Sequence, residues 1–139
     1  MNYYLDDGQT KLVPDLLDAK AKEIQERIVP LNNRGFADFR EGVSSSQLRR
    51  FFMEFRGLEK RVQHAKDFEA VLPLIRMVKS KAAYALNSGT GAKIPQSFQK
   101  FLVDNIDAIH NRRDFEAFML YFEAVVGFCY GVPGFAKKG

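Results

Sequence analysis

One long apolar segment, DFEAFMLYFEAVVGFCYG at 114–131, constrains the fold more than any other part of the chain. Only Glu116 and Glu123, two helical turns apart, indicate a solvent-exposed face on it. At about 100° per residue, seven apolar side chains fall on a single stripe: Phe115, Phe118, Met119, Phe122, Val125, Val126 and Cys129. A helix that is apolar around most of its circumference belongs at the centre of a bundle. We predict a central helix with Asp114 as its N-cap, ended by Gly131 and Pro133.

A membrane span is the alternative interpretation of the same segment. The run is at the short limit for crossing a bilayer, and its two carboxylates would each cost about 3 kcal/mol near the bilayer centre. We therefore favour a core helix and expect no membrane association.

The size and composition indicate one globular domain. The 139 residues are long enough for a proper core, and thirteen Phe with no Trp indicate a core filled with phenylalanine. The start, MNYYLDDG, lacks the basic and apolar regions of a signal peptide, and the single Cys129 lies on the core face as a small hydrophobe. We expect a single domain spanning 1–139 in a reducing, cytoplasmic compartment.

Four further segments show helical periodicity. They run from Pro14 to Pro30, from about 46 to 64, from Asp67 to about Asn87, and from Pro95 to near Asn111. Ser44 and Gln47 have the form of a capping box before the second of these segments. Residues 1–13 have no period and are expected to form a loosely held arm, and NSGTGAK at 87–93 a flexible joint. No segment alternates with period two, so the prediction is an all-α bundle of about five helices.

The sequence contains no recognisable catalytic or metal-binding pattern. His64 and His110 belong to different helices, and neither has a second ligand at metal-binding spacing. Glu116 and Glu123 are about 10 Å apart along a helix, too far for a coupled acid–base pair. The loop SGTGAK lacks the spacing and the preceding strand of a phosphate-binding loop. We expect no enzymatic activity, no metal and no cofactor.

The second predicted helix carries a basic face, which is the remaining candidate for a binding site. Arg49, Arg56 and Lys60 lie within roughly 20° of one line over about 16 Å of helix, with no acid among them. Arg50 and Arg61 lie on an adjacent line, where Glu54 dilutes their charge. The third helix adds further cations: Arg76, Lys79 and Lys81. The net charge is +4. A solvated face and a phosphate-binding face both explain this pattern. In the second case binding would be independent of sequence, because no exposed aromatic series is evident.

Three stretches together resemble the small subunit of the type III-A (Csm-type) CRISPR effector complex. They are SSSQLRRFF at 44–52, KSKAAYALN at 79–87 and FEAFMLYFEAVVGFCYGVPG at 115–134. Their order and spacing fit across about 44–134, and the last is the most specific. The resemblance implies a small, all-helical, non-catalytic protein. Several copies would stack along the guide RNA and its paired target single-stranded RNA, beside the backbone subunits and the large signalling subunit.

The expected RNA-binding residues come from two sources. The resemblance points to Arg49, after Gln-Leu, and to Lys81, before Tyr84. Helix geometry adds further candidates: Arg50, Arg56, Lys60, Arg76 and Lys79. Two other functions stay open: an adaptor bundle that binds no nucleic acid, and a helix-turn-helix DNA binder, which the long helices and their connections disfavour. We also expect self-association, as stacked copies or as a dimer formed across the joint at 87–93.

Overall fold

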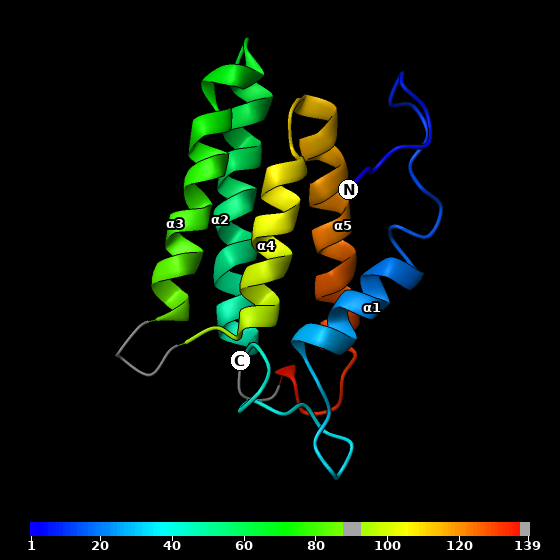
Figure 1. Cartoon of the computed structure of the whole chain (residues 1–139), viewed down its shortest axis with the longest axis vertical. Helices are drawn as coiled ribbons and strands as arrows, with labels where there is room; N and C mark the ends of the chain where they lie inside the picture. The colour runs from blue at the N-terminus through cyan, green and yellow to red at the C-terminus, as the bar shows by residue number, and fades with distance from the viewer. Residues whose placement is uncertain (88–92, 137–139) are drawn as a thin grey trace.

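Four long helices lie side by side along the long axis of the molecule, and a shorter helix crosses two of them (Figure 1). The computed structural model describes residues 1–87 and 93–136. The bundle consists of α2 (Ser45–His64), α3 (Leu72–Leu86), α4 (Gln96–Ala108) and α5 (Arg112–Tyr130). The crossing helix is α1 (Ala19–Ile28), which packs on α4 and α5. The all-α prediction is confirmed: within the described ranges there are five α-helices, one 3-10 turn and no strand.

The capping box predicted before the second helix is present. The Gln47 N–H donates to Ser44 Oγ at 3.2 Å, and the Ser44 N–H donates to Gln47 Oε1 at 3.1 Å. These reciprocal bonds satisfy two of the amide groups that a helix start leaves without partners. They fix where α2 begins, and with it the register of its basic side chains.

Two other helix starts differ from the sequence prediction. The N-cap of α5 is Asn111, whose Oδ1 accepts from the Asp114 N–H at 2.8 Å, and Asp114 itself lies buried in the first turn. Asp67 caps the short 3-10 turn η1 (Phe68–Ala70) instead of α3. Because α3 therefore begins only at Leu72, Pro73 falls in its first turn, where the missing N–H of proline costs nothing.

Phenylalanine rings fill the centre of the bundle, as the composition predicts. Phe122 on α5 is fully buried. Its ring centroid lies between 5.2 and 6.4 Å from five other rings, contributed by α2, α4 and α5: Phe52, Phe55, Phe98, Phe101 and Phe118. Several of these pairs are edge-to-face, the arrangement that aromatic quadrupoles favour. Thus α5 is the core helix, with Val126 alone of its predicted stripe only half-buried.

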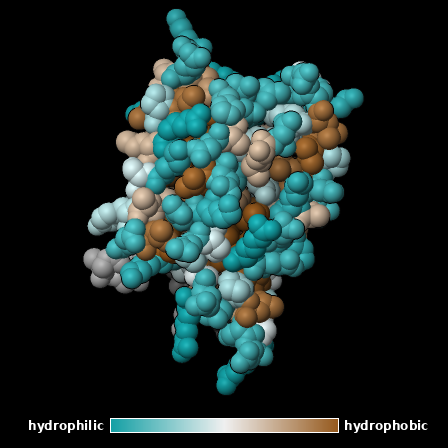
Figure 2. Space-filling model, in the orientation of Figure 1, coloured by the Kyte–Doolittle hydropathy of each residue, from teal (hydrophilic) through white to brown (hydrophobic). Residues whose placement is uncertain are grey.

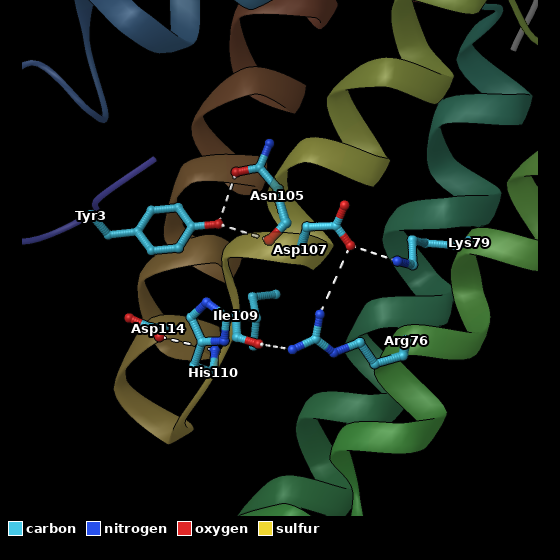
Figure 3. A network of polar contacts seen from close by, with 8 residues as sticks. All are labelled: Tyr3, Arg76, Lys79, Asn105, Asp107, Ile109, His110 and Asp114. Atoms are coloured by element: carbon cyan, nitrogen blue, oxygen red, sulfur yellow. Dashed lines mark hydrogen bonds and ion pairs between the residues drawn. The ribbon is translucent and has the colours of Figure 1, made fainter.

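The N-terminal arm is packed against the bundle, which corrects the prediction of a loosely held segment. Tyr3 and Tyr4 are buried, and the Tyr3 hydroxyl donates to Asn105 Oδ1 at 2.9 Å (Figure 3). The Tyr4 hydroxyl donates to the Arg113 carbonyl oxygen at 2.7 Å. Each tyrosine thus buries an apolar ring and pairs its polar end, which offsets the entropy of ordering the arm. Of the joint predicted at 87–93, residues 88–92 lie outside the described residues.

The face of the molecule seen in Figure 2 is predominantly polar. On the face seen in Figure 2, hydrophobic residues form separate patches among hydrophilic ones. Among the described residues, no helix combines the length and hydrophobicity that crossing a membrane requires.

Candidate nucleic-acid interface

The seven cations predicted to bind RNA do not form one surface. Arg49 and Arg56 contact α5, through Tyr130 and Glu123 respectively. Arg76 and Lys79 pair with Asp107 on α4. The other three line the seam between α2 and α3: Arg50, Lys60 and Lys81. The bundle therefore distributes the predicted site over three seams between helices.

Arg56 is held by contacts within the protein. Its guanidinium lies 2.8 Å from Glu59 Oε1 and 3.4 Å from Glu123 Oε1, and it covers the Phe52 ring at 4.8 Å. The hydrogen bond to Glu59 is the largest cause of the raised pKa of Arg56. The line of Arg49, Arg56 and Lys60 itself contains no acid, but Arg56 is paired from outside it, by Glu59 on the adjacent line and by Glu123 of α5. Arg49, on the same line, donates to the Tyr130 hydroxyl at 3.2 Å.

Arg76 and Lys79 join α3 to the end of α4 (Figure 3). Arg76 donates to the Ile109 carbonyl oxygen at 2.9 Å, and its other terminal nitrogen lies 3.8 Å from Asp107 Oδ1. Lys79 Nζ lies 2.5 Å from the same carboxylate oxygen. Arg76 thus satisfies a carbonyl group that the C-terminus of α4 leaves without a helical partner. Both cations stabilise the α3–α4 contact, which leaves them less available to an external anion.

A row of three hollows follows α2: the two outer hollows lie at its seam with α3, and the middle hollow is lined by α2 residues alone. Their volumes are about 350, 320 and 450 Å³, and neighbouring hollows share a lining residue, first Glu54 and then Arg61. We call this row the α2–α3 trough. Its principal lining side chains from α2 are Arg50, Met53, Glu54, Lys60, Arg61 and His64, and from α3 Lys81 and Tyr84. From Arg50 to His64 it extends about 21 Å along α2, at 1.5 Å per residue.

The trough is positively charged. Arg50, Lys60 and Arg61 are exposed, and no carboxylate in the described part of the chain lies within 4 Å of their charged groups. Glu54 is the one acid among the described residues that line the trough, and Lys81 Nζ approaches its Oε2 to 2.6 Å. The sequence indicated that Glu54 weakens the Arg50–Arg61 line. In the fold that charge is offset by a lysine from the next helix.

Gly57 lies at the middle of the trough and keeps it open. It is exposed in the interior of α2, where glycine costs up to about 1 kcal/mol relative to alanine. A Cβ built there meets no atom within 4 Å, so nothing within the described fold requires a glycine. A side chain at this position would occupy the space of the middle hollow. A glycine at this position leaves room for another molecule to approach the α2 backbone closely.

Among the described residues, the two glutamates on the exposed face of α5 lie close to arginines, and the cysteine of α5 is buried. Glu123 pairs with Arg56, while Glu116 lies 3.7 Å from Arg113 on its own helix. Burial raises the pKa of the Cys129 thiol to about 12, so this residue is a neutral part of the core. Across residues 1–87 and 93–136, no three His, Cys, Asp or Glu side chains converge as metal ligands would.

Comparison with known proteins identifies one family. The model of the family described as Csm2 Type III-A matches residues 18–130, a range that contains all five helices and the whole trough. No curated protein and no solved structure matches the chain.

Proposed function

Because this chain belongs to the Csm2 Type III-A family, the small subunits of type III-A CRISPR effector complexes, we propose that it binds single-stranded RNA along the α2–α3 trough. The observation that carries the proposal is the charge of the trough: within residues 1–87 and 93–136 it has three exposed cations without a carboxylate partner and a single acid, which is already paired. Phosphate groups are the ligands that such a surface attracts, with release of their counterions.

The proposed contacts involve the phosphate backbone and not the edges of the bases. Arg50, Lys60 and Arg61 contact phosphates, while Arg49 lies outside the trough and donates to the Tyr130 hydroxyl of α5. Three of the RNA-binding residues predicted from the sequence instead make contacts within the bundle, and we leave them out of the proposed RNA site: Arg56, Arg76 and Lys79. Phosphate contacts position a nucleic acid without reading its sequence. In the complex the ligands are the guide RNA and the target RNA, and the subunit has no catalytic role.

A second surface supports protein contacts in addition to RNA binding. A hollow of about 580 Å³ near the end of α5 is lined by Phe36, Phe39 and Tyr130, all three of them exposed. Exposed aromatic groups of this kind occur at protein interfaces. We assign this surface to a neighbouring subunit of the complex, whether a backbone subunit, the large signalling subunit or another copy. If the trough binds no RNA, this adaptor role becomes the leading function.

An RNA titration with matched charge variants tests the proposal. Replacing both Arg50 and Arg61 with Gln should weaken binding of two unrelated single-stranded RNAs equally. It should also lower the slope of log K against log salt by about 1.4, from about 0.7 for each lost phosphate contact. Arg34→Gln with Arg40→Gln is the control, since it removes two exposed charges from a loop that does not line the trough.

Fluorescence anisotropy at two salt concentrations gives both affinities and slopes. Equal losses in the trough variant and the loop control would show that net charge alone attracts the RNA and would contradict the assignment of the trough. No binding of RNA by the parent protein would leave only the adaptor role.

A further inference from the structure

The trough ends at a tyrosine that the fold leaves almost entirely in solvent. Tyr84, in the last turn of α3, has 75% of its surface exposed, more than any other large hydrophobic side chain in the described part of the chain. Aromatic rings pair with other flat groups by offset stacking or edge-to-face contact, and tyrosine is enriched at interfaces. Tyr84 thus differs from the aromatic side chains of the core, such as Phe55, Phe118 and Phe122, which are fully buried.

The hollow beside this ring combines an apolar floor with a charged rim. It has a volume of about 350 Å³, and its floor includes the buried ring of Phe51 together with Ala85. Arg50 and the Lys81–Glu54 pair stand on its rim. The charges on the rim sum to one positive charge, because Lys81 and Glu54 neutralise each other. As far as the described residues show, the site thus offers a flat apolar surface, one cation without a carboxylate partner, and a paired donor and acceptor.

We infer that this hollow receives an unstacked base of single-stranded RNA, with Tyr84 as the stacking platform and Arg50 on the adjoining phosphate. The inference rests on the proposed function, because it places one nucleotide of the same RNA at one end of the trough. A nucleotide carries both chemical features that the hollow complements, a flat π-face and an anionic phosphate. Stacking on aromatic side chains tolerates any base, so the site adds affinity without sequence preference.

The charge of the rim favours this occupant over an apolar peptide. A hydrophobic side chain entering the hollow would leave Arg50 without a compensating anion at the edge of the contact. A nucleotide pairs that cation and covers the ring in the same step. Arg50 also belongs to the row of cations along the trough, so the base site continues the proposed phosphate path.

Substitution of Tyr84 separates stacking from charge. Tyr84→Ala should weaken binding of a labelled oligouridylate by about 5-fold to 150-fold, the range that loss of one stacked base produces. The slope of log K against log salt should not change, because no phosphate contact is lost. Tyr84→Phe keeps the ring and should bind within about twofold of the parent. Met77→Ala is the matched control, since Met77 is exposed two turns earlier on α3 and lines none of the trough.

An RNA that lacks bases gives an independent readout. The parent protein should bind an abasic oligonucleotide with the affinity that Tyr84→Ala shows for the intact RNA, and the two losses should not add. If Tyr84→Ala binds like the parent while Arg50→Gln with Arg61→Gln loses affinity, the base site is wrong and the proposed function stands. If the parent binds no RNA, both are wrong.

Discussion

Gly57 provides the sharpest test of the trough, because stability and RNA binding should respond to its substitution in opposite directions. The residue lies in the interior of α2, on the solvent side, and a Cβ there would touch no other atom. Replacing it with alanine introduces no clash, lowers the entropy of the unfolded chain and improves helix propensity. Replacing it with leucine also improves propensity, and in addition places four carbon atoms in the middle hollow of the trough.

The expected change in stability follows from the length of the chain. Glycine to alanine at an exposed helical position is worth about 0.5 to 1 kcal/mol. Unfolding entropy near 2.1 cal/mol/K per residue gives roughly 0.29 kcal/mol/K for a chain of this size. The Tm of Gly57→Ala should therefore rise by about 2 to 3 °C. RNA affinity should fall slightly in Gly57→Ala and clearly in Gly57→Leu, because the added side chain keeps the RNA backbone away from α2.

Gly127 on α5 supplies the control. It is also an exposed helical glycine whose added Cβ meets nothing within 4 Å, but it does not line the trough. Gly127→Ala and Gly127→Leu should therefore raise Tm without affecting RNA binding. Calorimetry and fluorescence anisotropy on the four variants give both quantities. If Gly57→Leu binds RNA as tightly as Gly127→Leu, the RNA does not pass over the middle of α2, and close approach of a ligand is refuted as the reason for a glycine at this position.

Four further predictions concern the core, the arm, the dependence of stability on pH, and self-association. Phe122→Ala should leave a cavity among the surrounding rings and lower the free energy of unfolding by about 3–5 kcal/mol in a urea titration; a loss below about 1 kcal/mol would show that the site collapses or is not the core. Tyr3→Phe should cost about 1–3 kcal/mol, because it leaves buried Asn105 Oδ1 without its donor, and an unchanged urea midpoint would contradict the anchoring role. Burial raises the pKa of Tyr3 above its usual range and that of Cys129 to about 12, so both are neutral in the fold. Their contribution to the free energy of unfolding is complete below about pH 9. It declines at higher pH, because the two groups ionise first in the unfolded chain. A urea midpoint that stays constant from about pH 8 to 11 would contradict this. The free protein should dimerise at high concentration, and sedimentation of monomer alone over a hundredfold range would exclude it.

The bundle was predictable because its signals are local. The stripe on α5 and the Ser44–Gln47 box are each formed by residues within a few positions of one another, and helical geometry alone brings them together. The arm shows the limit of such reasoning. Tyr3 finds Asn105 more than one hundred positions away. No residue near Tyr3 in the sequence indicates that partner. Because the arm also lacks helical periodicity, the sequence predicts a loosely held segment.

The choice among the cations depends on contacts between helices that a helical wheel does not contain. On the helical wheel of α2, Arg56 stands among cations and Glu54 lies beside Arg50. The wheel therefore favours the line of Arg56 as the anion site. In the bundle the long side chains reach across the seams: Glu123 of α5 approaches Arg56, while Lys81 of α3 pairs with Glu54. These two cross-helix pairs reverse the ranking of Arg56 and Arg50 as anion-binding residues, because a charge that is paired within the protein attracts a ligand less strongly. The cations that line the trough from α2 are Arg50, Lys60 and Arg61. In the described part of the chain none of them has a carboxylate within 4 Å, so no such pair reduces their charge.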